Sequence, residues 1–186
     1  MPVVINNPTQ QVSGVILTGG FGSRLGGVDK GLVEWQGRPL IEHTLERLKP
    51  QVADIVVSAN RNRDDYLKYG WPVVADQSEH EWSPLGGVLA GGRAALLNWL
   101  LFVPVDSPFM PRNLSFRLAS SMQGLARRAH DGRETQSDFA LVHRHRLFDA
   151  YRQLVSGQIE SAAWLDHVIP LGPGSSGVPD GRRAPV

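Results

Sequence analysis

A glycine-rich loop directly follows the first apolar run of this chain, and this pairing is the strongest constraint on its fold. The run Val12-Ser13-Gly14-Val15-Ile16-Leu17 has the composition of a buried strand, and residues 17–30 read Leu-Thr-Gly-Gly-Phe-Gly-Ser-Arg-Leu-Gly-Gly-Val-Asp-Lys. Glycines let the backbone turn tightly and bring its N–H groups close to an anion, while lysine and arginine can neutralise phosphate charge. A strand that opens into such a loop predicts a nucleoside triphosphate site.

The loop differs from the two commonest phosphate-binding patterns. No Gly-Lys-Ser/Thr closes it, and Gly20-x-Gly22 is not followed by a third glycine in the register of a dinucleotide fold. Taken alone, the loop is also compatible with a plain surface connection between a strand and a helix.

Strand-like and helix-like segments alternate along the chain, which is typical of a parallel sheet with crossover helices. We expect an α/β protein with a three-layer Rossmann-like fold, in which a mostly parallel sheet lies between helices. Segment 99–105 is nearly all apolar, as in a central strand buried on both faces. The expected strands are 12–18, 53–58, 72–75, 99–105 and 137–143, and the expected helices are 39–49, 64–69, 83–98, 111–122, 147–156 and 160–164.

Length and composition fit one globular domain. The chain has 186 residues, of which 41% are hydrophobic and 20% are charged, and this is enough to bury a sizeable core. We expect residues 1–169 to form a single domain with its nucleotide-binding part at 12–125. Residues 170–186 are rich in glycine, proline and serine, so we expect a flexible tail there.

Charge and cysteine content exclude several classes of protein. A net charge of +1 argues against non-specific binding of nucleic acid, which requires a strong basic excess. The absence of cysteine excludes disulfides and thiolate metal sites. There is no apolar run of membrane-spanning length and no secretory signal pattern near the N-terminus. We therefore expect a cytoplasmic, monomeric protein with no membrane or nucleic-acid partner.

Polar residues follow three of the predicted strands. Asn60, Asp76 and Asp106 come after segments 53–58, 72–75 and 99–105, and ligands of such folds bind beyond the carboxyl ends of the strands. A carboxylate after a buried strand needs a positive partner, which Mg²⁺ on nucleotide phosphates would supply. The alternative for Asp106 is a turn or helix cap, and Asn60 and Asp76 are also common turn residues.

Two cations in the loop region could act on phosphates. Lys30 could reach an α-phosphate and stabilise the charge of the transition state, and Arg24 could bind the β- and γ-phosphates and assist the departure of pyrophosphate. The alternative for both is a solvated surface position, which is usual for lysine and arginine.

Four glycines, at positions 86, 87, 91 and 92, lie in the predicted helix 83–98, where each costs up to ~1 kcal/mol relative to alanine. Either a bulky ligand or a packed strand must therefore approach this helix closely.

His143 and His145 would share one face of a strand, but without a third ligand we interpret them as surface polar residues.

Several sequence blocks together resemble a known family over about residues 12–125. They occur in the family's order, and such a series is far more specific than any single block. The blocks are Leu17-Thr18-Gly19-Gly20, Ser23-Arg24-Leu25-Gly26-Gly27, Asp29-Lys30-Gly31-Leu32, 55–61, 74–76, 83–87 and 102–108. They resemble the nucleotidyltransferases with a Rossmann-like core, and among these most closely the molybdenum cofactor guanylyltransferases.

This resemblance implies a Mg²⁺-dependent enzyme of molybdenum cofactor biosynthesis. It would transfer GMP from GTP to molybdenum-molybdopterin and release pyrophosphate, with transient contact to molybdoenzymes or their chaperones. The family's catalytic residues correspond to Arg24, Lys30 and Asp106, with Asp106 as the metal ligand. The implied GTP contacts are Leu17, Thr18, Gly19, Gly20, Lys30, Asn60, Asp76 and Asp106, and the candidate acceptor contacts are Pro84, Leu85, Gly86 and Gly87.

The second half departs from the family's pattern. Thr135-Gln136-Ser137-Asp138 stands where relatives carry a His-Pro pair, and no asparagine follows Asn113, where they carry Asn-x-Asn-Thr-Pro. These family residues are implicated in holding molybdopterin. Two alternatives therefore stay open: a related nucleotidyltransferase that uses CTP or a sugar-phosphate acceptor, and a protein that carries GTP or molybdopterin without catalysis.

Overall fold

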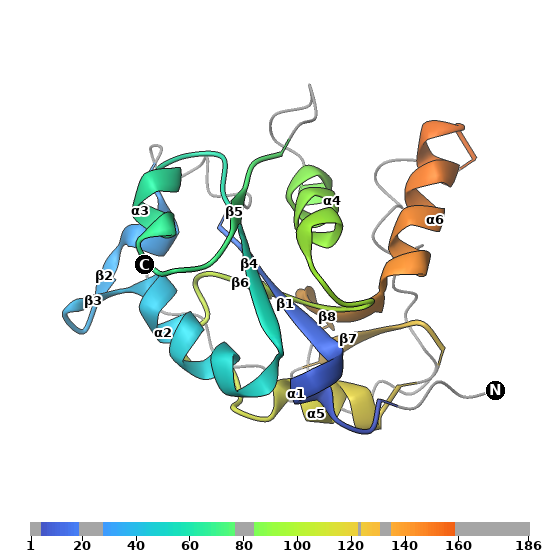
Figure 1. Ribbon diagram of the computed structural model, residues 1–186, viewed down its shortest axis with the longest axis horizontal. Helices are drawn as coiled ribbons and strands as arrows, with labels where there is room; N and C mark the ends of the chain where they lie inside the picture. Colours follow the sequence, from blue (N-terminus) through green and yellow to red (C-terminus); the bar gives the residue numbers. More distant parts are fainter. Residues whose placement is uncertain (1–4, 19–27, 77–83, 123, 131–134, 159–186) are drawn as a thin grey trace.

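A six-stranded sheet with the strand order β5-β4-β1-β6-β8-β7 forms the centre of the molecule. The structure is a computed structural model that describes residues 5–18, 28–76, 84–122, 124–130 and 135–158. Strands β5, β4, β1 and β6 pair in parallel, whereas β8 is antiparallel to β6 and to β7 (Figure 1). The strands are β1 (Val12–Leu17), β4 (Asp54–Ser58), β5 (Val73–Val74), β6 (Trp99–Pro104), β7 (Ala126–His130) and β8 (Thr135–His143).

Helices cover both faces of this sheet, which gives the expected three layers. One face packs against α1 (Pro8–Gln11), α2 (Leu40–Leu48) and α5 (Leu114–Ser120), and the other against α4 (Pro84–Ala94) and α6 (Arg144–Val155) (Figure 1). The short helix α3 (Arg63–Leu67) lies beside β5. No helix in the described ranges is long and apolar enough to cross a membrane.

The side chains of β1 pack into the hydrophobic cores on both faces of the sheet. Val12 and Ile16 belong to the core cluster under α2 and α5, whereas Val15 belongs to the cluster under α4 and α6. All six residues of β6 are buried, because this strand is covered on both faces and paired on both edges. The sequence-based prediction of a central strand at 99–105 is therefore confirmed.

Two predicted helices are shorter than their sequence patterns. The helix predicted at 111–122 is α5, which spans only Leu114–Ser120. We expected 83–98 to be helical, but α4 ends at Ala94. The backbone N–H of Leu96 donates instead to Asp54 Oδ2 (3.3 Å), and that of Leu97 donates to Ser13 Oγ (3.0 Å). These strand side chains take the N–H groups that a longer helix would have used, and so redirect the chain into β6.

The local sequence pattern did not predict two pairings of strands, β7 with β8 and β2 (Glu34–Trp35) with β3 (Arg38–Pro39). Strand β7 contains two arginines and lacks a run of apolar residues, and its pairing with β8 depends on a contact distant in sequence. The hairpin of β2 and β3 turns at Gln36 and Gly37, whose φ values of 49° and 76° are typical of a type I′ turn. The predicted helix 160–164 and tail 170–186 lie outside the described residues.

The close approach of α4 to β1 generates a stability prediction. A Cβ at Gly91 would overlap the side chain of Val15, which is fully buried in the strand and cannot move aside. Gly91→Ala should therefore lower the free energy of unfolding by about 1–3 kcal/mol in urea denaturation. A stabilised Gly91→Ala variant would contradict this packing, since glycine to alanine in an open helix position stabilises by up to ~1 kcal/mol.

Candidate active site

The carboxyl ends of four parallel strands lie along one edge of the sheet, held together by backbone hydrogen bonds. The N–H of Val105 donates to Leu17 O (3.0 Å), and the N–H of Thr18 donates to Ser58 O (3.1 Å). The N–H of Ala59 donates to the carbonyl of Val74 (2.8 Å), which joins the end of β5 to this edge. The edge lies between α3 and α4, the helices that follow β4 and β5 (Figure 1). This is the place where α/β sheets bind ligands.

Lys30 and Asp106 form an ion pair at this edge, with 3.1 Å between Nζ and Oδ2. Asp106 is only 6% exposed, and it follows the buried strand β6. The Thr44 hydroxyl donates to Val105 O (2.7 Å) and so fixes the backbone just before the carboxylate. A carboxylate this deeply buried needs a positive partner, and Lys30 supplies one.

Asp29 begins the 3-10 turn η2 (Lys30–Leu32) and caps it, accepting from the N–H of Gly31 (3.2 Å). Its carboxylate also accepts from the Tyr66 hydroxyl and from Asn62 Nδ2 (3.0 Å). Sequence reasoning missed this group. Asp29 adjoins Lys30 in one of the family blocks, but nothing local shows that a tyrosine in a short acidic helix is completely buried.

Asn60 and Asp76 contact each other at the far end of the same edge. The Asp76 N–H donates to Asn60 Oδ1 (2.7 Å), which joins the segments after β4 and β5. The Asp76 carboxylate lies over the first turn of α4, where a Cβ at Gly86 would overlap it. The positive end of a helix dipole favours a carboxylate in this position.

The four glycines of α4 face two different sets of side chains. Gly91 and Gly92 face core side chains, so packing explains them, whereas Gly86 and Gly87 face Asp76 and the Ser58 hydroxyl. All four glycines therefore lie where other side chains of the protein approach the helix closely, and a ligand contact at residues 84–87 stays a prediction.

Most of the predicted site residues lie on this one edge, and the others cannot be placed. Leu17 ends β1 and Thr18 follows it. Lys30 contacts Asp106, and Asn60 contacts Asp76. The candidate acceptor residues 84–87 form the first turn of α4. Gly19, Gly20 and Arg24 lie outside the described residues.

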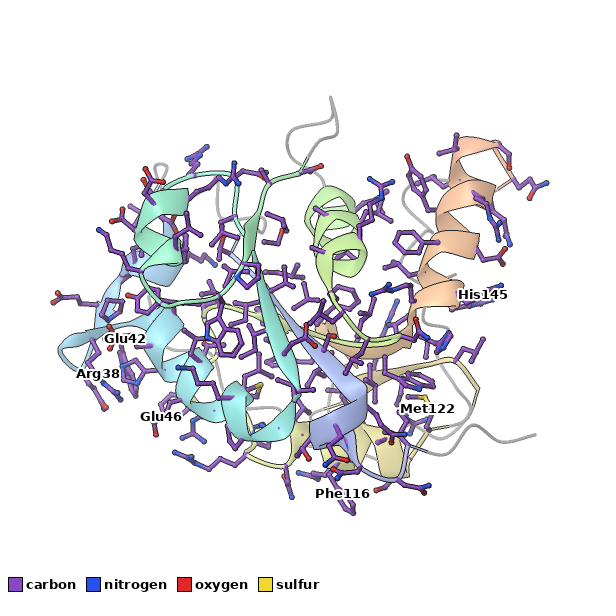
Figure 2. The ribbon with its side chains drawn as sticks, in the orientation of Figure 1. Arg38, Glu42, Glu46, Phe116, Met122 and His145 are labelled. Carbon is purple, nitrogen blue, oxygen red and sulfur yellow. The ribbon has the colours of Figure 1, made fainter. Side chains whose placement is uncertain are left out.

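His143 and His145 do not share a strand face, because β8 ends at His143 and α6 begins at Arg144. The His143 ring packs edge-on against Trp99 and accepts from the N–H of His145 (3.3 Å), so it caps α6, with His145 at the base of that helix (Figure 2). Burial, with the neighbouring His145 and Arg144, lowers the pKa of His143. In the part of the chain that the structure describes, no three His, Asp or Glu residues are grouped as a metal cluster.

An α/β sheet with a lysine–aspartate pair and further polar residues along its carboxyl edge fits a nucleotide-binding protein, and the comparison with known families places it in the nucleotidyltransferase class. The family model of the MobA-like NTP transferase domain matches residues 14–169. The chain belongs to this family.

Curated relatives support this membership. A molybdenum cofactor guanylyltransferase of Ralstonia pickettii is 47% identical over 116 residues, which span 62% of this chain and 57% of the relative. The protein of that name from Mannheimia succiniciproducens is 44% identical over 72% of each chain. The one from Yersinia pestis is 38% identical over 84% of this chain and 81% of its own length.

Solved structures share the fold at low sequence identity. Molybdopterin-guanine dinucleotide biosynthesis protein A from Archaeoglobus fulgidus superposes with a TM-score of 0.62 at 20% identity, covering 83% of this chain and 78% of its own. The 2-C-methyl-D-erythritol 4-phosphate cytidylyltransferase of Thermus thermophilus superposes with a TM-score of 0.70 at 17% identity, covering 95% and 93%. Both superpositions confirm the predicted fold class.

The contact between Asp76 and α4 generates a prediction about nucleotide binding. Gly86→Ala should displace the Asp76 carboxylate and weaken nucleoside triphosphate binding by about tenfold or more in calorimetric titration, since one misplaced charged contact costs about 1.5–3 kcal/mol. Gly87→Ala is the matched control on the same helical turn, because the atoms nearest to its Cβ belong to Ser58 (Oγ at 2.9 Å) and Leu17 and not to Asp76. Equal affinities of both variants and the unmodified protein would show that Asp76 has no part in the site.

Proposed function

We propose that this protein transfers GMP from GTP to molybdenum-molybdopterin, forming the guanine dinucleotide cofactor and releasing pyrophosphate. The observation that carries the proposal is the Lys30–Asp106 pair, which lies on the same sheet edge as Asn60 and Asp76. The relatives named molybdenum cofactor guanylyltransferase support the choice of nucleotide and acceptor.

The proposed chemistry needs little beyond positioning and charge. A terminal phosphate oxygen of the acceptor attacks the α-phosphorus of GTP, the bond to the bridging oxygen of the β-phosphate breaks, and pyrophosphate leaves with its electron pair. The attacking phosphate is already anionic, so no strong general base is required. Lys30 would neutralise charge that develops on the α-phosphate, and Arg24 would assist the leaving group.

Mg²⁺ is part of this proposal, with Asp106 as its ligand. One or two carboxylates together with substrate phosphates are the usual magnesium site of nucleotide enzymes, so a single buried carboxylate fits a metal that arrives with its nucleotide. The metal would neutralise and align the phosphates. In this structure Lys30 Nζ lies 3.1 Å from Asp106 Oδ2. The ammonium would move from the carboxylate to phosphate when the metal binds.

Asn60 and Asp76 are proposed to select guanine. Because Asn60 Oδ1 accepts the Asp76 N–H, the Asn60 side chain offers its Nδ2 hydrogens to a ligand. An amide donor suits guanine O6, and a carboxylate suits the N1–H and the exocyclic amine.

Contact with molybdoenzymes or their chaperones would follow release of the product.

The function is tested by incubating the purified protein with labelled nucleoside triphosphates, Mg²⁺ and molybdopterin. GTP should be consumed with release of pyrophosphate, and chelation of Mg²⁺ should stop the reaction. Asp106→Asn should lower kcat by about 100-fold or more, which is the usual scale for a lost electrostatic group at the reacting centre. Asp149→Asn is the control, because Asp149 pairs with Arg152 on α6 (3.0 Å) and should leave turnover unchanged.

Three results would contradict the proposal at separate points. Consumption of CTP in place of GTP would overturn the assignment of the base, and unchanged turnover of Asp106→Asn would overturn the role of Asp106. Binding of GTP and molybdopterin without any product would favour a carrier protein.

A further inference from the structure

Asp29 stands immediately before Lys30, where an uncompensated carboxylate would repel nucleotide phosphates. Three donors prevent this. Oδ1 accepts from the N–H of Gly31 (3.2 Å) and from the Tyr66 hydroxyl, and Oδ2 accepts from Asn62 Nδ2 (3.0 Å). The negative charge of Asp29 is therefore satisfied within the protein, and both carboxylate oxygens are fixed by residues of the segment that begins α3.

Tyr66 is a rigid anchor for this arrangement. Its side chain is completely buried in the core between α2, α3 and the sheet. A Cβ at Gly31 would overlap the Tyr66 hydroxyl and would meet Val105 Cγ2 at 2.9 Å. Val105 directly precedes Asp106, so the backbone of η2 is held tightly between the phenol and the segment that carries the other member of the ion pair.

The surroundings of the Tyr66 hydroxyl keep it protonated. Burial and the hydrogen bond to the Asp29 carboxylate raise the pKa of Tyr66 far above its usual value. The phenol therefore stays protonated and remains a donor to Asp29.

We propose that Tyr66 and Asn62, acting through Asp29, are positioning residues: they fix the turn η2 and so place Lys30 at the sheet edge, from which its ammonium can reach the reacting phosphate. Neither side chain contacts Lys30 itself. The chain of contacts runs from the buried phenol to the Asp29 carboxylate, from there to the turn η2, and from η2 to Lys30 Nζ and Asp106 Oδ2. The inference rests on the proposed function in one respect, which is that Lys30 acts on phosphate.

Tyr66→Phe tests this inference because it removes the hydroxyl and keeps the ring. We expect kcat for GTP turnover to fall by about tenfold, the value of one hydrogen bond of about 1.4 kcal/mol, while the KM for GTP changes less than about threefold. Tyr69→Phe is the matched control, because the Tyr69 hydroxyl contacts a different carboxylate, that of Glu42 on α2 (3.5 Å; Figure 2 labels Glu42), away from Lys30.

Asn62→Gly provides a second variant that avoids backbone strain. Asn62 has a φ of 48°, a left-handed conformation that glycine adopts freely, so this change removes the amide donor alone. It should lower kcat in the same direction as Tyr66→Phe. Normal kcat values for both variants would overturn the proposal.

A double-mutant cycle separates positioning from general stability. In a Lys30→Met background, Tyr66→Phe should cause no further loss of single-turnover rate, because the group that it positions is gone. Additive losses would show that Tyr66 acts elsewhere, and would leave the proposed function intact. If instead the unmodified protein does not turn over GTP, the function is wrong and the NMR experiment below still tests the contact.

The chain has three lysines, Lys30, Lys49 and Lys68, so their side-chain ε-CH₂ NMR signals can be assigned singly. In Tyr66→Phe the Lys30 signal should shift, and those of Lys49 and Lys68 should stay in place. In Tyr69→Phe the Lys30 signal should not move. An unchanged Lys30 signal in Tyr66→Phe would overturn the proposal without any measurement of activity.

Discussion

The parallel pairing of β1 with β4 on one side and β6 on the other is the constraint on which the site depends. Each of these three strands ends at the same edge, and the chain reaches β6 only after it has crossed over β1 from β5. The crossover through α2 covers one face and the crossover through α4 covers the other. Strand β1 therefore ends where the strand order reverses, which is where such sheets leave room for a ligand.

In the described part of this edge, each of three carboxylates has a group that compensates its charge. Asp106 has the Lys30 ammonium, Asp29 has three hydrogen-bond donors, and Asp76 lies at the positive end of α4. This matters because a site for a triphosphate cannot tolerate bare negative charge nearby. The partner of Asp106 is a lysine ammonium that a metal ion can replace, which suits a carboxylate that must later accept a metal.

The helix α4 shows how packing and function share one element. Its second half carries glycine so that the helix can approach Val15 and Leu147, and its first turn carries glycine where the Asp76 carboxylate and Ser58 lie. The helix would be intrinsically more stable with alanine at these positions, so their glycines reflect the space available and not helix propensity.

The sequence by itself determined the α/β class, the central strands and the residues at their carboxyl ends, because apolar periodicity and turn residues are local signals. It also determined the family, through several blocks in order. Only the tertiary structure decided that Asp29 is held by Tyr66, that α4 ends at Ala94, and that β7 pairs with β8. These features depend on contacts between segments far apart in the chain, and no local pattern encodes which buried hydroxyl or strand edge will lie opposite.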